Sequence, residues 1–268
     1  MKLLFAILSV SILIVTGVKD YCRLCPDHVA CNKKNEFASK CVNPKMVELN
    51  KGLFVDEHNK KRNLVAGGGV AKLKPACRMA TMTWDDELAF LASYNVKQCD
   101  MKHDTCYPTE KFPHSGQNLA LHSDKNNIEQ AAVNMWYGEV KTCEQQDIDS
   151  FPEWNRGFHI GHFTVMVRQE NNHLGCAAAE YDSNGYRQYL IACNYASTNM
   201  MGGFPVYNSC SKATTGCKSG TNSQYPNLCS TSEMYKLNGW INNELFRKEN
   251  VFENVLSGWP QNGISYEC

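Results

Sequence analysis

The pattern of apolar and polar residues predicts two helices early in the chain. The stretch 46–65 suits a helix that ends at the glycines 67–69, because glycine readily terminates a helix. A second helix is expected to begin near Thr83, a residue type that caps helix N-termini, with acidic residues in its first turn. Helical spacing predicts that its buried face consists of Leu88, Leu91, Ala92 and Val96.

A third helix is expected from about 128 to 140. Apolar residues recur there at helical spacing, namely Ile128, Ala131, Ala132, Met135 and Trp136. Glu139 follows Ile128 by 11 residues, almost a whole number of turns at about 3.6 residues per turn, so it falls on the apolar face. Because an isolated carboxylate is costly to bury, two interpretations stay open. Either Glu139 has a partner or a polar cavity, or it reaches water at the helix end.

A β-hairpin is expected over 173–195, with Asn184-Gly185 as its two-residue turn. Counting outward at constant register puts Cys176 opposite Cys193. Opposed strand residues have Cβ atoms about 4.5–5.5 Å apart, and a disulfide needs roughly 3.5–4.5 Å. The register alone therefore predicts a disulfide between these two cysteines.

The first 17 residues are typical of a secretory signal, with Lys2 before an apolar stretch and small residues before the expected cleavage after Gly17. The apolar stretch is shorter than the ~20 residues that span a bilayer, so no membrane span and a secreted, extracellular protein are expected. We divide the remainder into an N-terminal cysteine-rich segment, 18–45, a central domain, 46–200, and a C-terminal cysteine-rich extension, 201–268.

The composition is typical of a folded, disulfide-bonded protein without an excess of charge. Hydrophobic residues make up 43% and charged residues 20%, which is typical of a folded globular chain. Basic and acidic residues number 27 each, so there is no electrostatic footprint for nucleic acid or an anionic membrane. The 14 cysteines, an even number behind a secretory signal, favour disulfides over metal thiolates and allow seven bridges.

Five motifs in a known order indicate a family. Residues 158–168, FHIGHFTVMVR, and 189–195, YLIACNY, resemble the two signature stretches of the CAP superfamily, which joins cysteine-rich secretory proteins, antigen 5 and pathogenesis-related 1 proteins. The other three similar segments are FVDEHNKKR at 54–62, HSGQNLA at 114–120 and NMWYGEV at 134–140. The resemblance implies an α+β fold, a disulfide-rich three-layer α-β-α sandwich with a largely antiparallel central sheet, and a short helix at GHFTVMVR.

The cysteine layout resembles one branch of this family, the insect antigen 5 group. The segments that carry this likeness are DYCRLCPDHVAC at 20–31, CDMKHDTC at 99–106, SGTN at 219–222 and YPNLC at 225–229, the last two most similar to fly-type proteins. The group's pattern implies the bridges Cys22–Cys31, Cys25–Cys106, Cys41–Cys99 and Cys176–Cys193. Six cysteines are left without an expected partner: Cys77, Cys143, Cys210, Cys217, Cys229 and Cys268.

Carried across by motif, the family's central cavity corresponds to His103, Gln117, Glu139 and His162, with His114 as a rival for the first position. Imidazoles and carboxylates are good zinc ligands, so His103, Glu139 and His162 are the candidate metal ligands. Gln117 stands where the family usually has glutamate, and this loss of a negative charge predicts weaker zinc binding than in relatives. Three interpretations stay open: structural histidines without metal, weak binding of zinc or another divalent ion, and a hydrolytic metal centre.

The chain departs from the family's motifs at two further places. Val165 and Arg168 replace the usual glutamine and tryptophan, and the stretch 196–199 lacks the usual proline and glycine.

Hydrolysis lacks its usual motifs. The sequence contains neither His-Glu-x-x-His nor Gly-x-Ser-x-Gly, and Ser115 beside His114 is a weak indication of a triad because sequence neighbours rarely form one. We interpret Cys22-x-x-Cys25 as structural rather than redox-active, and residues 60–62, Lys-Lys-Arg, as a solvated helix face.

The expected function is that of a secreted antigen 5-like binding protein, not an enzyme. The resemblance implies that the protein binds small hydrophobic ligands, such as a sterol or fatty acid, or host proteins. It also implies a component of saliva, venom or haemolymph that can act as an allergen. Two alternatives are a zinc-dependent hydrolase or protease, and a structural or scavenging module. No cofactor is expected beyond weakly bound zinc or another divalent metal.

Overall fold

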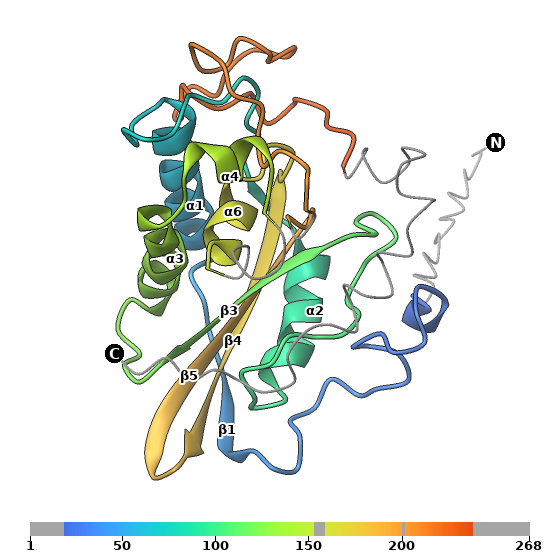
Figure 1. The fold of residues 1–268 in the computed structure, drawn as a ribbon. Helices are drawn as coiled ribbons and strands as arrows, with labels where there is room; N and C mark the ends of the chain where they lie inside the picture. The colour runs from blue at the N-terminus through green and yellow to red at the C-terminus, as the bar shows by residue number, and fades with distance from the viewer. Residues whose placement is uncertain (1–18, 153–158, 200–201, 238–268) are drawn as a thin grey trace, which may run out of the picture.

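A central sheet separates two helical layers (Figure 1) in this computed structural model, which describes residues 19–152, 159–199 and 202–237. The strand order is β1 (Val42–Val47), β4 (His173–Ser183), β5 (Tyr186–Tyr195) and β3 (Gly116–His122), all antiparallel. The short β2 (Thr83–Trp84) pairs with β4 in parallel. The largely antiparallel α+β sandwich expected from the sequence is confirmed.

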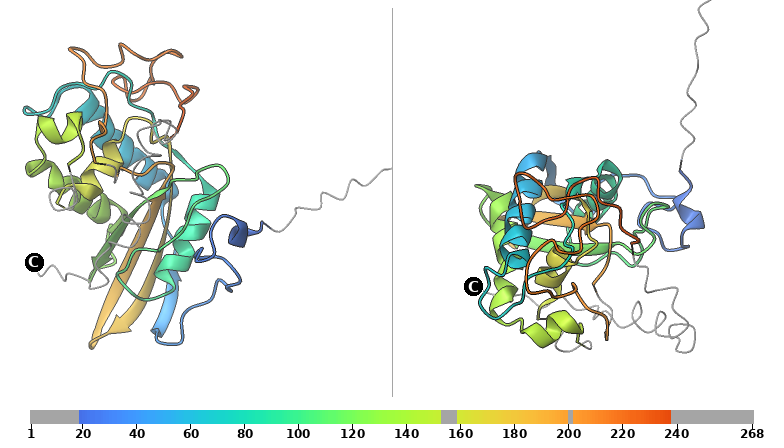
Figure 2. Two further views of the ribbon diagram at one scale, coloured as in Figure 1. Left: turned by 45° about the vertical axis from the view of Figure 1, so that its right-hand side comes forward. Right: turned by 90° about the horizontal axis from the view of Figure 1, so that it is seen from above.

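The helices divide between the two faces of the sheet (Figure 2). One face carries α1 (Lys51–Ala66), α3 (Ile128–Gly138), α4 (Gln145–Asp149) and α6 (Gly161–Val167). The other face carries α2 (Asp86–Val96), while η1 (Tyr21–Arg23) belongs to the N-terminal segment and η2 (Glu139–Lys141) follows α3. No helix in the described ranges is both long and apolar enough to cross a bilayer.

The central hairpin is apolar on both faces because both are covered. Ala178 pairs with Ile191, and both residues belong to the core beneath α1 and α3. The next pair, Ala177 and Ala192, belongs to the core beneath α2. Alternate residues of one strand therefore enter different cores, as expected for a sheet buried on both sides.

The hairpin prediction is confirmed at its turn and in its register. Asn184 and Gly185 have φ values of 51° and 81°, the left-handed conformation that a tight two-residue turn requires. Cys176 lies opposite Cys193, and the two form a disulfide.

The first predicted helix extended too far toward the N-terminus. Residues 42–47 form β1, and α1 begins only after Asn50, whose side chain accepts a hydrogen bond from the Leu53 amide at 3.0 Å. Met46 and Val47 pair with β4 because their apolar side chains suit a strand as well as a helix. The sequence reasoning missed this strand, which contains Pro44.

The predicted N-cap of the second helix was also wrong. Asp85 caps α2, accepting hydrogen bonds from the Glu87 and Leu88 amides at 3.0 Å. Thr83 instead pairs with β4, where its amide donates to the Asn172 carbonyl at 2.9 Å. The predicted face is confirmed, since its four apolar residues are all fully buried.

The third helix is confirmed with one exception. It ends at Gly138, and Met135, predicted to be buried, has 44% of its surface exposed. Helical spacing puts Met135 at the edge of the apolar stripe, whereas Ile128, Ala132 and Trp136 lie fully within it.

The positive run in α1 is not a solvated face. Arg62 is fully buried, and its guanidinium donates to the carbonyls of Ala80, Met166 and Arg168 at 2.6–2.9 Å. Lys60 alone fits the expectation, exposed and paired with Asp56 at 2.6 Å. A buried guanidinium is tolerated here because several carbonyl dipoles surround it.

Six disulfides link the described residues. The four expected ones are present: Cys22–Cys31, Cys25–Cys106, Cys41–Cys99 and Cys176–Cys193. Cys77–Cys210 and Cys217–Cys229 are additional, and the first of these ties the C-terminal extension to the central domain. Cys143 is buried, while Cys268 and the predicted signal lie outside the described residues, so a seventh bridge stays a prediction.

Candidate functional site

The four candidate cavity residues come from separate elements and meet as two hydrogen-bonded pairs. Glu139 follows α3, and His162 lies in the first turn of α6. Gln117 lies in β3, and His103 lies in the loop after α2. That loop is held at both ends, because Cys99 and Cys106 each form a disulfide with the N-terminal segment.

The first pair joins Glu139 and His162. One carboxylate oxygen of Glu139 lies 2.7 Å from Nδ1 of His162, and the other accepts the backbone amide of Phe163 at 2.9 Å. Both oxygens of Glu139 are therefore engaged. A carboxylate accepts hydrogen bonds, so it favours the tautomer of His162 with the proton on Nδ1.

The second pair joins Gln117 and His103, and its polarity follows from a chain of contacts. Asn194 donates through Nδ2 to the Leu88 carbonyl at 3.3 Å, which turns its Oδ1 toward Gln117. Nε2 of Gln117 donates to this oxygen at 3.0 Å and to Oδ2 of Asp104 at 2.8 Å. Oε1 of Gln117 must then face Nδ1 of His103, 2.9 Å away, and that nitrogen must carry the proton.

Both imidazoles therefore favour the same tautomer, with the proton on Nδ1 and a lone pair on Nε2. Burial, opposed by the hydrogen bond with Gln117 and assisted by nearby His162, lowers the pKa of His103 to about 4. His103 is consequently uncharged at neutral pH. This is the protonation state that a metal ligand or a hydrogen-bond acceptor needs.

Asp104 carries a negative charge behind Gln117. Burial raises the pKa of its carboxyl to about 6, opposed by the hydrogen bond from Gln117. The Asp104 backbone amide also donates to Oε1 of Gln117 at 3.2 Å. A glutamate at position 117 would place a negative charge next to His103. Here the negative charge lies on Asp104 instead, which is hydrogen-bonded to the far side of the Gln117 amide.

The arrangement orients two imidazoles without a complete set of metal ligands. Glu139 is occupied by its two hydrogen bonds, and Gln117 is directed at His103. Within the described residues, no group of three or more His, Cys, Asp or Glu side chains is placed to hold a metal ion. The structure brings the candidate residues together, and the metal site of His103, Glu139 and His162 stays a prediction.

A buried histidine beside this site was missed. His58 in α1 is fully buried, with Nδ1 2.8 Å from the Phe54 carbonyl and Nε2 2.8 Å from the Tyr195 hydroxyl. Asn118 donates to that hydroxyl at 3.3 Å and to the His162 carbonyl at 3.1 Å. This network supports the backbone at His162. His58 lies four residues after Phe54 on the apolar face of α1, which was the available signal.

Ser115 and the Cys22-x-x-Cys25 motif have structural roles, while the rival position of the His114 side chain stays a prediction. The Ser115 hydroxyl donates to the Phe112 carbonyl at 3.1 Å, and the His114 carbonyl accepts the Thr198 amide at 2.8 Å. Cys22 and Cys25 belong to two different disulfides, which agrees with the structural interpretation of that motif.

The sandwich fold, the disulfides and the paired imidazoles define a class of protein. Residues 55–195 match the model of the cysteine-rich secretory protein family, CAP, and the chain belongs to this family. It is 38% identical over 240 residues to Venom allergen-1 of Aedes aegypti, a match that covers 84% of this chain and 93% of that protein. It is 36% identical over 167 residues to the Antigen 5 like allergen Cul n 1 of Culicoides nubeculosus, covering 59% of this chain and 76% of that protein. Within the family, the chain belongs to the insect antigen 5 group.

A solved structure supports the same fold. The crystal structure of NaASP2 with Zn²⁺ matches with a TM-score of 0.57 and 28% sequence identity, and covers 71% of this chain and 100% of that one.

Proposed function

We propose that this chain is a secreted antigen 5-like protein that binds a small hydrophobic ligand, such as a sterol or fatty acid, or a host protein, and that it is not an enzyme. The binding function rests on membership of the antigen 5 group. The observation that carries the non-enzymatic part of this proposal is the engagement of Glu139. Because one of its oxygens binds His162 and the other binds the Phe163 amide, it is not poised as a general base for an attacking water.

The cysteines support the same conclusion. Twelve of them form the six disulfides, so none of these is a thiolate nucleophile. Cross-links of this density suit a protein that must persist outside the cell.

Weak divalent-metal binding is a secondary proposal. It is supported by the two imidazoles of His103 and His162, which Gln117 and Glu139 orient, and by the zinc in the NaASP2 structure. Zinc would act there as a Lewis acid, and the protein would orient both imidazoles through Gln117 and Glu139. Two histidine donors without an unoccupied carboxylate favour weak binding over a hydrolytic centre.

Saturable ligand binding tests the proposal. Titration of the purified protein with a fluorescent sterol and a fluorescent fatty acid should give a saturating signal at micromolar concentration, displaced by the unlabelled lipid. If neither lipid binds, pull-down of host plasma or tissue proteins should recover a stoichiometric partner. Failure of both assays would favour the structural or scavenging alternative.

Chelation tests the enzymatic alternative. Any esterase or protease activity of the preparation should be unchanged after zinc is removed with a chelator and in His162→Ala. Activity that both treatments abolish would contradict the binding proposal.

A further inference from the structure

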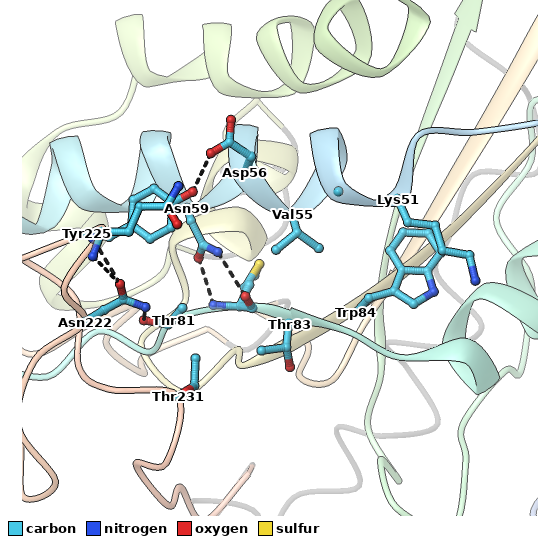
Figure 3. A pocket seen from close by; sticks show the side chains of 13 residues that line it. Lys51, Val55, Asp56, Asn59, Thr81, Thr83, Trp84, Asn222, Tyr225 and Thr231 are labelled. Atoms are coloured by element: carbon cyan, nitrogen blue, oxygen red, sulfur yellow. Dashed lines mark hydrogen bonds between the residues drawn. The ribbon is translucent and has the colours of Figure 1, made fainter.

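A groove lies away from the paired histidines, between the N-terminal half of α1, residues 81–84 and residues 222–231 of the C-terminal extension (Figure 3). Its volume is about 580 Å³, within the range of ~300–1,000 Å³ typical of small-molecule sites. None of its lining residues belongs to the two histidine pairs. It is open to solvent along its length.

The lining combines aromatic, hydroxyl and amide groups. Trp84 lies at one end and Tyr225 at the other, with Val55 between them (Figure 3). The polar groups along the floor and rim are Thr81, Thr83, Thr231, Asn222 and Gln224. An aromatic plane beside many neutral polar groups suits a ligand whose rings have both C–H faces and hydroxyl edges.

The charged groups at the groove are already paired. Lys51 lies 2.8 Å from Asp86, and Lys60 lies 2.6 Å from Asp56. Asp56 also accepts a hydrogen bond from the Tyr225 hydroxyl. A charged ligand would have to displace these partners, so the groove favours a neutral ligand.

Two of the lining hydroxyls already donate hydrogen bonds within the protein. The Thr81 hydroxyl donates to the Cys229 carbonyl at 2.6 Å, and the Thr83 hydroxyl donates to the Asn172 carbonyl at 3.3 Å. The buried Thr81 oxygen also accepts from Nδ2 of Asn222 at 3.2 Å, so of these two hydroxyls Thr83 is the one that offers an acceptor lone pair to a ligand. A sterol or fatty acid has one polar end, whereas a sugar has a hydroxyl on most ring carbons.

The open shape also argues against a lipid. Burial of apolar surface stabilises a complex by about 25 cal/mol per Å². In an open groove, part of a lipid's apolar surface would stay in water and would not contribute to this stabilisation. A saccharide in an open groove can pack one face on an indole and keep its outward hydroxyls hydrated.

The groove is preformed. Asn59 of α1 exchanges two hydrogen bonds with the Met82 backbone, at 2.8 and 2.9 Å. The indole nitrogen of Trp84 donates to Asp86 at 3.0 Å. The ammonium of the exposed Lys51 lies over the indole ring, 5.4 Å from its centre, and this side chain would move aside when a sugar packs on that face. Binding would therefore cost little ordering of the protein.

We propose that this groove binds a short, neutral oligosaccharide, with a sugar ring packed on Trp84 and its hydroxyls directed at Thr83, Thr231 and Gln224. The site is separate from the histidine pairs and has a different ligand class from the lipid or host protein proposed above. Its failure would leave that proposal unchanged.

Calorimetric titration of the full-length, disulfide-bonded protein with chitotetraose, cellotetraose and mannotetraose tests the inference. At least one should bind saturably below about 1 mM, and Trp84→Ala should weaken binding by about tenfold or more. Trp84→Phe should retain most of the affinity. Tyr186→Ala, which removes a 71%-exposed aromatic ring from the distant hairpin, should bind like the wild type.

Thr231→Arg provides a second variant, because this exposed rim residue can fill the groove without disturbing the core. It should abolish binding even if Trp84→Ala fails to fold. Binding to ribonuclease B but not to unglycosylated ribonuclease A would identify a protein-attached glycan as the source of the saccharide. Binding to the free tetrasaccharides alone would identify a free saccharide. Absence of binding to every probe, or binding unchanged in Thr231→Arg, would overturn the inference.

Discussion

Gln117 determines the polarity of the histidine site. Its Nε2 faces two acceptors, Asp104 and Asn194, so its oxygen is fixed toward His103. A glutamate at this position could not donate to either acceptor. Gln117 and Asp104 therefore form a matched pair, because the amide can donate to the carboxylate. With glutamate at position 117, two carboxylates would instead lie side by side.

Gln117→Glu should destabilise the protein, because a second acceptor would lie about 2.8 Å from the Asp104 carboxylate. We expect the free energy of unfolding to fall by about 1–3 kcal/mol, measured by urea denaturation at pH 7.5. Adding Asp104→Asn should recover most of this loss, since an amide would again face a carboxylate. Equal stabilities of wild type and Gln117→Glu would contradict the matched pair.

His58 should make stability depend on pH. Burial lowers its pKa from 6.5 to about 4, so the unfolded chain binds this proton first and stability falls as pH decreases from about 6.5 to 4. The lowered pKa of His103 acts in the same direction, whereas the raised pKa of Asp104 opposes it over an overlapping range. The two shifts largely offset each other. Burial also lowers the pKa values of four other histidines, namely His28, His114, His122 and His173. His58 is therefore one of several histidines that make stability fall as pH decreases.

The slope in this window should be about 1.4 kcal/mol per pH unit for one histidine. Urea midpoints measured across the window check it, and His58→Gln should flatten the curve. A slope that is the same in His58→Gln would show that another group titrates.

At the scale of elements, α2 packs tightly against β4. A Cβ atom on Gly175 would lie 2.2 Å from the Ala89 nitrogen and 2.4 Å from the Asp85 carbonyl oxygen. Both are backbone atoms that cannot move without shifting the helix. The absence of a side chain at Gly175 therefore sets the distance between helix and sheet.

Gly175→Ala should destabilise the protein by more than about 3 kcal/mol, because overpacking against backbone forces the whole helix outward. Gly138→Ala is the matched control, since a Cβ there would meet nothing within 4 Å and alanine favours the helix. Thermal unfolding of the two variants should show a large decrease for the first and no decrease for the second. Similar melting temperatures would contradict the close packing.

The elements that could be predicted from sequence are those fixed by local chemistry. Asn184-Gly185 determined the turn and register of the hairpin, and through them the Cys176–Cys193 disulfide. The strand at Met46 could not be separated from the helix after it, because apolar periodicity over a few residues suits both. Thr83 has a cap-forming side chain, yet its pairing with β4 is a tertiary effect that the local sequence does not contain.

The histidine site was only partly predictable, because its hydrogen bonds are tertiary contacts that the local sequence does not contain. Motif resemblance placed His103, Gln117, Glu139 and His162 together, and Ile128 spacing put Glu139 on the inner face. The hydrogen bonds that determine their roles come from Asp104 and Asn194, which no pattern along the chain singles out. Arg62 was misjudged because the carbonyls around it come from residues far along the chain.

At the scale of the whole molecule, disulfides join parts that share little regular structure. The Cys77–Cys210 bridge spans 133 residues and anchors the extension that forms one wall of the groove. The extension is further held by Glu233, which accepts the Lys218 and Ser219 amides and pairs with Arg78.

Replacing both Cys77 and Cys210 by alanine should cost about 4–5 kcal/mol, because the lost cross-link closes a long loop. Thermal unfolding measures the loss, and limited proteolysis should cleave the extension of the variant first. Replacing Cys22 and Cys31, whose bridge spans only 9 residues, should cost less. The reverse order would contradict this assignment of the anchor.

We propose that the two histidine pairs belong to a binding protein and not to a zinc hydrolase. Native mass spectrometry of the protein purified from its source, with metals and ligands retained, tests this most directly. We predict a chain that carries a non-covalent organic ligand or partner and substoichiometric zinc. One tightly bound zinc per chain, together with hydrolysis that is lost when the zinc is removed, would contradict it.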